Sequence, residues 1–280
     1  MTNSTKIWFI TGAARGIGFE IAKAALANGD RVVATSRTID GLADKFGAVE
    51  AILTLPLDVT DPASAQSAVE KATAHFGRID VLVNNAGYGQ LGVFEEISHS
   101  TIEKQFDTNV YGTMHVTRAV LPVMRAQKSG HIFNMSSIGG ALGFDIASIY
   151  CATKFAVEGF SECLALELKP FNIGITIVEP GFFRTDFLAP TSVQFADTPI
   201  SDYAEYANAT QTAYSGQNHA QPGDPVKLGA ALVKVASLDI PPMRLLMGSD
   251  AVQYLGAGYE ARVAELNDWK DVSTSTDIGA

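Results

Sequence analysis

The chain has 280 residues, of which 47% are hydrophobic and 18% are charged, and its formal net charge is −10. This length is sufficient for one large α/β domain with a substantial core. An acidic chain has no electrostatic attraction for nucleic acids or anionic membranes, so we expect neither as a partner.

Cysteine and histidine usage bears on compartment and metal content. Cys151 and Cys163 lie on one predicted helix, where a structural disulfide is rare, so we expect free thiols and a cytoplasmic location. The N-terminal segment lacks the pattern of a secretory signal, and no apolar run approaches the roughly 20 residues that span a bilayer. We expect no catalytic metal, because metal-ligand spacing is not evident among His75, His99, His115, His131 and His219.

Short β-branched segments alternate with longer amphipathic segments. The first predicted strand, 6–12, leads into a helix over 15–30, and the helix after the third strand has Asp61 as its N-cap and Pro62 in its first turn. Further strands are predicted over 31–37, 51–61, 79–87, 130–137, 172–181 and 243–248. This alternation of apolar strands with helices indicates an α/β fold of the Rossmann type, with a doubly wound, mostly parallel seven-stranded sheet and helices on both faces.

Two segments depart from this alternation. Residues 186–222 form a long polar and aromatic insertion, which is more typical of a substrate-binding lid or loop than of a linker. Residues 249–280 form a C-terminal extension whose last residues are expected to fray. We therefore predict a single domain over residues 1–280 that carries both additions.

The end of the first strand has the composition of a phosphate-binding turn. The segment TGAARGIG, residues 11–18, places Gly12, Gly16 and Gly18 between a strand and a helix, with Arg15 and Ile17 in the same turn. Glycine lets the backbone approach a pyrophosphate, whose charge then meets the N–H groups and dipole of the helix. The strand–turn–helix context therefore favours a nucleotide site over a simple tight turn.

The end of the second strand bears on which dinucleotide binds. An acidic residue there bonds the adenosine ribose, whereas an arginine favours a 2′-phosphate. The segment TSRT contains Ser36 and Arg37 and no acid, and Arg15 adds a second positive charge. We predict NADP(H) in preference to NAD(H), and Asp40, a few residues further on, keeps NAD(H) possible.

Seven motifs, in order along the chain, resemble those of the short-chain dehydrogenases/reductases of the TGxxxGxG and YxxxK type. They are TGAARGIG (11–18), LDVTD (57–61), NNAG (84–87), NVYG (109–112), SS (136–137), YCATK (150–154) and PGFFRTD (180–186). Each motif is modest alone, but the ordered set across about residues 6–190 is highly specific.

This resemblance implies a role for each matching residue. It implies that Tyr150 is the catalytic acid/base, assisted by Lys154 and Ser137, and that Asn109 lies in a helix and holds a water near Lys154. It also implies cofactor contacts from Asp58 and Val59 at the adenine, from Asn85, Ala86 and Gly87 beside the cofactor, from Pro180 and Gly181 near the nicotinamide, and from Thr185 at its carboxamide.

These residue types suit carbonyl reduction. A nicotinamide supplies the hydride, because protein side chains cannot, and a proton must come from a group beside the developing alkoxide. A free tyrosine titrates near about 10, and we expect Lys154, four residues away on one helix face, to lower the pKa of Tyr150. We expect the Ser137 hydroxyl to hydrogen-bond the substrate oxygen and to position the carbonyl.

The candidate substrate pocket is mostly apolar and lacks a cationic cluster for a carboxylate or phosphate. Its candidate residues are Ser137, Tyr88, Gln90, Phe144, Ile146, Phe182, Phe183, Phe187 and Leu188, and Arg184 is interpreted as a structural or surface residue. We predict an NADP(H)-dependent carbonyl reductase or alcohol dehydrogenase for a small lipophilic ketone, aldehyde or alcohol. The alternatives are a non-catalytic NADP(H)-binding sensor and an epimerase or dehydratase on the same fold.

The resemblance also implies self-association. Family members commonly form homodimers or homotetramers through two long helices, which here correspond to residues 98–126 and 150–169. Residues 249–272 extend past the usual end of the family, so they either add to such an interface or obstruct it.

Overall fold

The computed structural model describes residues 5–47, 50–189 and 192–279. Residues 1–4 of the segment examined for a secretory signal, residues 190–191 of the predicted lid and residue 280 of the predicted extension lie outside the described residues, as do residues 48–49.

Seven parallel strands form the central sheet, in the order β3-β2-β1-β4-β6-β7-β9. They are β1 (Ile7–Ile10), β2 (Arg31–Ser36), β3 (Ile52–Pro56), β4 (Val81–Asn84), β6 (Gly130–Met135), β7 (Ile173–Pro180) and β9 (Arg244–Met247). Every predicted strand is therefore confirmed, over a shorter span than its apolar run. Strands such as β1 and β4 are buried throughout because helices cover both faces of the sheet.

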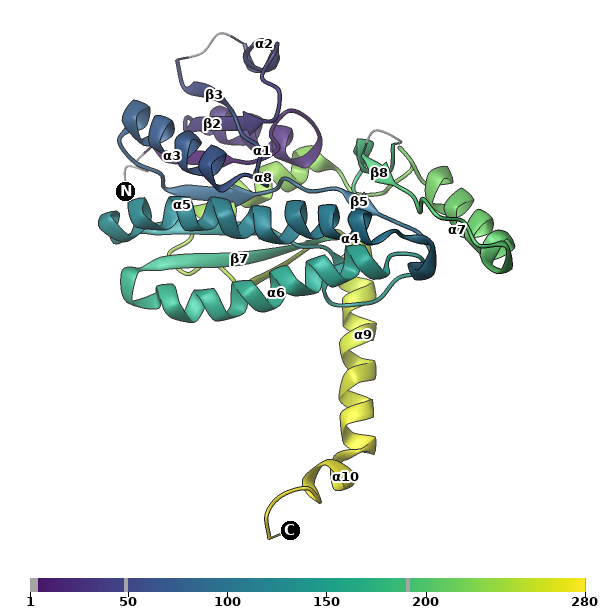
Figure 1. Cartoon of the computed structure of the whole chain (residues 1–280). Helices are drawn as coiled ribbons and strands as arrows, with labels where there is room; N and C mark the ends of the chain where they lie inside the picture. The colour runs from purple at the N-terminus through teal and green to yellow at the C-terminus, as the bar shows by residue number, and fades with distance from the viewer. Residues whose placement is uncertain (1–4, 48–49, 190–191, 280) are drawn as a thin grey trace.

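The two helical layers have separate apolar cores (Figure 1). On one face, α3 (Pro62–Phe76), α5 (Gly112–Gln127) and α6 (Ser148–Leu168) pack against the sheet; on the other, α1 (Gly16–Ala27) packs with α8 (Pro225–Ala236). The predicted cap of α3 is confirmed, since the Asp61 carboxylate accepts a hydrogen bond from the Ala63 N–H at 2.9 Å. This is the predicted doubly wound, Rossmann-type α/β fold.

The long helix predicted over 98–126 is interrupted. It consists of α4 (His99–Phe106), a π-helical turn over Asp107–Tyr111 and then α5. Neither glycine nor proline lies within Asp107–Tyr111, so no residue in this turn signals a break in the helix. Such π turns are frequent at functional sites, and this one contains Asn109.

The predicted lid has more regular structure than a loop. A 3-10 turn over Asp186–Leu188 is followed by β8 (Val193–Gln194), which pairs in parallel with β5 (Gly89–Gln90), and later by the helix α7 (Ala204–Gly216). In Figure 1, β5, β8 and α7 stand together beside one end of the sheet. The lid is thereby tied to the turn that follows β4.

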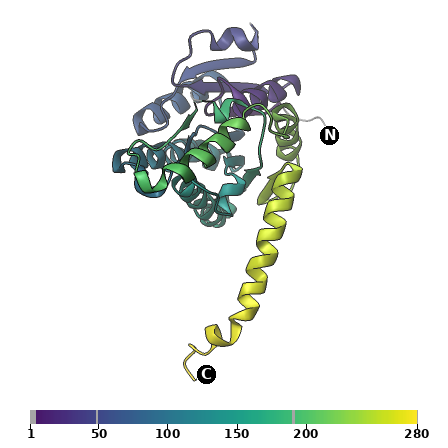
Figure 2. The ribbon, with the colours of Figure 1, turned by 90° about the vertical axis from the view of Figure 1, so that its right-hand side faces the viewer.

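The C-terminal extension is helical and leaves the body of the molecule. It contains α9 (Ser249–Asp268), the short α10 (Lys270–Thr274) and a few further residues. Figures 1 and 2, which are related by a quarter turn, both show α9 running outward from the domain. Among the helices that the structure describes, none is both long and apolar enough to cross a bilayer.

Candidate active site

A cavity of about 690 Å³ lies at the carboxyl ends of the sheet strands. Its lining includes the residue that ends or follows each of several strands: Gly12 after β1, Ser36 in β2, Leu57 after β3, Asn85 after β4, Met135 in β6 and Pro180 in β7. Open α/β sheets bind their ligands at this edge. The strand order therefore gathers residues that are far apart in the sequence around one space.

The glycine turn after β1 forms one wall of the cavity. Gly12 and Gly16 line it with positive φ angles of 67° and 58°, and α1 begins at Gly16 with Ile17 also facing the cavity. The first N–H groups of α1 are therefore available to an anion. Gly18 is different: it does not line the cavity, and a Cβ there would collide with the Asn85 side chain and the Gly12 carbonyl.

The predicted Asn-Ala-Gly turn is bonded to the glycine turn. The Asn85 amide donates to the carbonyls of Thr11 and Gly12, at 2.9 and 3.1 Å. The Thr11 hydroxyl in return accepts hydrogen bonds from the backbone N–H groups of Asn85 and Ala86, both at 2.9 Å. Asn85, Ala86 and Gly87 all line the cavity, so the ends of β1 and β4 present one continuous wall.

Cations gather at the β2 end of the cavity. Arg15, Ser36 and Arg37 all line it, whereas Asp40 does not. Lys45, on α2 (Leu42–Phe46), was not considered from the sequence; its ammonium donates to the Ala14 carbonyl of the glycine turn at 3.1 Å. This end therefore offers positive charge rather than an acidic partner for a ribose diol.

Asp58 and Val59 line the cavity at the β3 end. The Asp58 carboxylate accepts hydrogen bonds from the N–H and the hydroxyl of Thr60, at 3.0 and 2.7 Å. These bonds hold the loop after β3 in a fixed shape beside the cavity.

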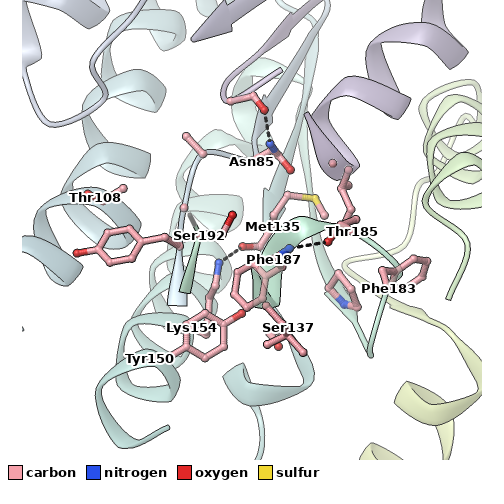
Figure 3. A pocket seen from close by; sticks show the side chains of 18 of the residues that line it. Asn85, Thr108, Met135, Ser137, Tyr150, Lys154, Phe183, Thr185, Phe187 and Ser192 are labelled. Carbon is pink, nitrogen blue, oxygen red and sulfur yellow. Dashed lines mark hydrogen bonds between the residues drawn. The ribbon is translucent and has the colours of Figure 1, made fainter. Parts of the chain in front are cut away.

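Tyr150, Lys154 and Ser137 meet in this cavity, as Figure 3 shows. Tyr150 and Lys154 lie one turn apart on α6, and the Lys154 ammonium lies 5.7 Å from the centre of the Tyr150 ring. Ser137 follows β6; its hydroxyl accepts a hydrogen bond from the Gly139 N–H at 3.1 Å and also interacts with Tyr150. The sheet edge and one helix face thus bring the three predicted groups together.

The pKa of Tyr150 departs from the sequence-based expectation of a lowered value. Burial raises the pKa of the Tyr150 phenol to about 12, and the hydrogen bond with Ser137 lowers it only in part. The Phe187 ring, 5.8 Å away between centroids, contributes to the apolar surroundings. Desolvation disfavours the phenolate more than the neighbouring protein groups favour it. The prediction that Lys154 lowers the pKa of Tyr150 below its ordinary value is therefore wrong when only protein groups surround the phenol.

Lys154 is almost fully buried, with 8% of its surface exposed. Its ammonium donates a hydrogen bond to the Met135 carbonyl at the end of β6, at 2.8 Å (Figure 3). Burial lowers the pKa of Lys154 to about 8, and the Glu158 carboxylate acts in the opposite direction. At neutral pH the Lys154 side chain still carries its positive charge, so it is a buried cation in the lining of the cavity.

Asn109 is buried in the π turn and does not itself line the cavity. Its amide donates to the Tyr88 carbonyl at 3.1 Å and to the Thr153 hydroxyl at 3.2 Å, and its oxygen accepts from the Tyr88 N–H at 3.2 Å. A Cβ on Gly87 would lie 3.0 Å from this oxygen and 3.9 Å from the Lys154 ammonium. Asn109 therefore fixes the loop after β4 next to Lys154.

The turn after β7 supplies the opposite wall. Pro180, Gly181 and Thr185 line the cavity, and the Thr185 hydroxyl accepts a hydrogen bond from the Phe187 N–H at 3.2 Å. Thr185 faces the glycine turn, since a Cβ on Gly16 would lie 3.7 Å from its Cβ. The Phe182 N–H donates to the Asp250 carboxylate at 2.7 Å, which attaches this turn to the base of α9.

The remaining part of the cavity is apolar and aromatic. Of the side chains predicted for the substrate pocket, Ser137, Tyr88, Phe144, Phe182, Phe183, Phe187 and Leu188 line it, whereas Gln90 and Ile146 do not. Arg184 also stays outside and donates to the Gln221 carbonyl at 3.1 Å, in line with a structural role. Further residues that were not predicted from the sequence also line the cavity, among them Leu91, Ala147, Cys151, Ser192, Gln194 and Tyr214.

The lining as a whole fits a dinucleotide with a reactive ring. The glycine turn leaves a cradle beside a helix N-terminus, arginines stand at one end, and a buried lysine stands with a tyrosine at the other. Among the described residues, no group of three His, Cys, Asp or Glu side chains is placed to hold a metal ion.

Comparison with known proteins agrees with this geometry. The family model described as short chain dehydrogenase matches residues 6–194. The chain belongs to the short-chain dehydrogenase/reductase family. It is 37% identical to a 3-ketodihydrosphingosine reductase of Bacteroides thetaiotaomicron over 244 residues, which are 87% of this chain and 88% of that protein.

Solved structures place the fold in the same family. The crystal structure of a short-chain dehydrogenase from Streptomyces avermitilis is 41% identical, with a TM-score of 0.90 over 99% of this chain and 100% of its own. The structure named ElxO with NADP bound is 28% identical, with a TM-score of 0.72 over 90% and 99% of the two chains. The protein is thus a member of an oxidoreductase family that uses nicotinamide cofactors on small molecules.

Proposed function

We propose that this protein is an NADP(H)-dependent oxidoreductase that interconverts a lipophilic ketone or aldehyde and the corresponding alcohol. The observation that supports this most directly is the meeting of Tyr150, Lys154 and Ser137 in the cavity that the glycine turn also lines. A sensor without turnover has no need of this set of groups.

In this proposal the glycine turn and α1 hold the pyrophosphate, Asp58 and Val59 contact the adenine, and the Asn85–Gly87 turn flanks the cofactor. Lys154 holds the nicotinamide ribose, and Pro180, Gly181 and Thr185 hold the ring itself. When bound, the cofactor supplies or accepts the hydride. The chemistry left to the protein is to orient the carbonyl, to exclude water and to transfer one proton.

Tyr150 is the proposed proton donor. A phenol with a pKa near 12 keeps its proton at neutral pH, yet it is a stronger acid than the alcohol that forms when the alkoxide is protonated. Tyr150 would donate this proton to the substrate oxygen as negative charge develops there. The phenolate that remains is stabilised by the Lys154 ammonium, and the Ser137 hydroxyl aligns the substrate oxygen beforehand.

The preference for NADP(H) rests on Arg15 and Arg37. Both line the end of the cavity where the adenosine ribose belongs, and Asp40 does not. Lys45, tethered to the glycine turn, adds a third positive charge nearby. A 2′-phosphate would therefore meet favourable charge at this end, although NAD(H) remains an alternative ligand.

A lipophilic substrate is supported by the wall opposite the glycine turn. Phe144, Phe182, Phe187 and Tyr214 line it, and Arg184 is occupied by the Gln221 carbonyl. The name of the relative from Bacteroides, 3-ketodihydrosphingosine reductase, denotes a ketone with a lipophilic chain. We further propose a homo-oligomer in the cytoplasm, where Cys151 and Cys163 stay as the free thiols that the structure contains.

The test is the loss of NADPH absorbance with a panel of ketones and aldehydes of increasing chain length. Wild type should turn over long-chain members, and Tyr150→Phe should lose about 10²–10⁴-fold in kcat. NADPH binding, followed by its fluorescence, should be nearly unchanged in Tyr150→Phe. Tight NADPH binding without turnover of any member would instead favour the sensor. Equal turnover by both forms would exclude the acid role.

A further inference from the structure

Gln221 is a polar side chain that is buried within an exposed segment. Its neighbours Ala220 and Pro222 face solvent, whereas Gln221 is 2% exposed and lines the active-site cavity. The segment connects α7 to α8 and lies beyond residue 186, where the motifs of the family resemblance end. Glutamine is mostly found on protein surfaces, so its burial at this one position needs a cause.

The backbone around Gln221 is fixed to the turn after β7. The Gln221 carbonyl accepts a hydrogen bond from the Arg184 guanidinium at 3.1 Å. Two residues further on, the Gly223 N–H donates to the Phe182 carbonyl at 2.9 Å, and the Gly223 carbonyl accepts from the Arg184 N–H at 2.8 Å. A Cβ on Gly223 would lie 2.8 Å from the Phe182 carbonyl, so the two segments are in close contact. Gln221 is therefore held beside the cavity wall to which Thr185, labelled in Figure 3, belongs.

The side-chain oxygen of Gln221 is buried without a hydrogen-bond partner. Within the part of the chain that the structure describes, two cavity-lining residues have such an oxygen, Ser136 and Gln221. The Ser136 hydroxyl has the Glu158 carboxylate beside it, because a Cβ on Gly140 would lie 2.2 Å from one and 3.0 Å from the other. An unmatched buried oxygen is costly, and methionine would fill the space of Gln221 without that cost. The terminal torsion of glutamine is broad, so a small rotation offers this oxygen to a ligand in the cavity.

The partner that this oxygen lacks is a hydrogen-bond donor. The phosphates of a dinucleotide bring acceptor oxygens and cannot satisfy it. NADP(H) carries donors on the adenine, on the riboses and on the nicotinamide carboxamide. In the proposed site the adenine belongs by Asp58, the adenosine ribose by Arg37 and the nicotinamide ribose by Lys154. The carboxamide belongs by Thr185, on the wall to which Gln221 is fixed.

We propose that Gln221 binds the nicotinamide carboxamide, with its side-chain oxygen accepting a hydrogen bond from the carboxamide N–H group. This inference rests on the proposed NADP(H) site and adds a cofactor-binding residue to it. A contact to the carboxamide restrains rotation of the ring about its bond to the ribose, and so orients the carbon that carries the hydride. Arg184, which does not line the cavity, acts through Gln221 by holding its backbone in place.

The experiment compares two ligands that differ only at the carboxamide. In the 3-acetylpyridine analogue of NADP⁺ a methyl group replaces the amide nitrogen, so the carbonyl stays and the N–H donors are lost. Each ligand displaces NADPH from the protein without substrate present, and NADPH fluorescence gives both Kd values. Wild type should bind NADP⁺ about 3–10-fold more tightly than the analogue, which is the contribution of one hydrogen bond between neutral groups.

Three variants assign this difference to one side chain. Gln221→Met keeps the volume but removes the acceptor, so the Kd for NADP⁺ should rise by about 3–10-fold while the Kd for the analogue stays unchanged. Gln221→Glu keeps an acceptor oxygen and should keep the wild-type ratio of the two Kd values, because the two ligands carry the same charge. Gln217→Met is the matched control, since Gln217 is exposed in the same segment and does not line the cavity. Far-UV circular dichroism checks that each variant is folded.

The proposal is overturned if wild type binds the two ligands equally, a result that needs no variant. It is also overturned if Gln221→Met weakens both ligands by the same factor, because the residue would then only support the wall. Unchanged Kd values with a raised KM for a ketone would place Gln221 against the substrate instead.

The outcome is separate from that of the proposed activity. No turnover is measured, and the carboxamide is common to NADP(H) and NAD(H). An inactive protein, or one that prefers NAD(H), therefore gives the same comparison with the matching pair of ligands. If wild type binds no nicotinamide cofactor at all, both the proposed function and this inference are wrong.

Discussion

Glu158 lies one helical turn beyond Lys154 on α6, and its carboxylate raises the pKa of the Lys154 ammonium while burial lowers it. Glu158 is itself buried, with 5% exposed, and forms an ion pair with Arg244. Arg244, on β9, also pairs with Glu162 at 2.7 Å and with Glu179 at 3.1 Å. The charge of the active-site lysine is therefore coupled to a carboxylate cluster behind it.

Replacing Glu158 by Gln should move the alkaline limb of the pH–rate profile. The groups around Lys154 are the Tyr150 ring, the Met135 carbonyl, Asn109 across Gly87, and Glu158. Without the Glu158 charge the pKa of Lys154 falls below about 8, so the ammonium is lost at a lower pH. We expect kcat/KM to decline from a lower pH in Glu158→Gln, measured with one ketone across pH 6–9.

Glu162→Gln is the control for this experiment. Glu162 lies one turn further along α6 and also binds Arg244, but it is exposed and does not act on Lys154. Its profile should overlay that of wild type. If both variants move the alkaline limb equally, the effect comes from Arg244 and its packing rather than from the charge beside Lys154.

Arg37→Asp should reverse the coenzyme preference. The arginine lines the end of the cavity assigned to the adenosine ribose, and an aspartate would repel a 2′-phosphate while accepting hydrogen bonds from a ribose diol. We expect the Kd for NADPH to rise by about 10–100-fold, because charge-assisted hydrogen bonds contribute about 1.5–3 kcal/mol, with the Kd for NADH unchanged or lower. Lys71→Asp, an exposed site on α3, makes the same charge change away from the cavity. An unaltered NADPH/NADH ratio in Arg37→Asp would contradict the arginine argument.

Phe187→Ala should weaken the binding of large apolar substrates. The Phe187 ring lies in the lid, 5.8 Å from the Tyr150 ring, and covers Gly89 on the other side. The half-buried Phe187 ring would be covered by a bound apolar substrate, and a fully covered phenyl group contributes about 1.5–3 kcal/mol, so KM for a long-chain ketone should rise by about 10–100-fold. Because Phe187 also contributes to burial of the phenol, the pKa of Tyr150 should fall toward its ordinary value. Equal losses for acetone and a long-chain ketone would argue for a collapsed lid instead.

The site residues that lie at the carboxyl ends of the strands could be predicted from the sequence. Gly12, Asn85 and Ser137 each lie one or two residues after a strand, and Pro180 ends β7, so the parallel-sheet rule places them at one edge without knowledge of contacts. The observed strands are shorter than predicted for a related reason. Several predicted ranges include residues past the strand end, such as Gly12, Arg37 and Ser137, which line the cavity instead of pairing in the sheet.

What the sequence missed depends on long-range packing. The π turn at Asn109 has no local signal, because it arises where α4 and α5 must bring the amide to Tyr88 and Thr153. Tyr214 reaches the pocket from α7, where its hydroxyl donates to the Asp145 carbonyl, 69 residues away in the sequence. The raised pKa of Tyr150 likewise follows from enclosure, which the spacing to Lys154 does not report.

Glu179→Gln should stabilise the folded protein, and more so at high pH. Glu179 is fully buried in β7, and burial, together with Glu158, raises its pKa to about 7 from an ordinary 4.5. A raised carboxyl pKa means that the charged form is disfavoured in the folded state. This cost is absent below pH 4.5, grows between 4.5 and 7, and is complete above 7.

Glutamine resembles the protonated acid and removes that cost. With about 1.4 kcal/mol for each pKa unit, we expect a gain of about 1–3 kcal/mol at pH 8 and a smaller gain at pH 5.5. Urea unfolding at fixed protein concentration measures both, with Glu162→Gln as the control that removes an exposed partner of Arg244. If Glu179→Gln is instead less stable by the same amount at both pH values, the ion pair with Arg244 outweighs the desolvation of the carboxylate.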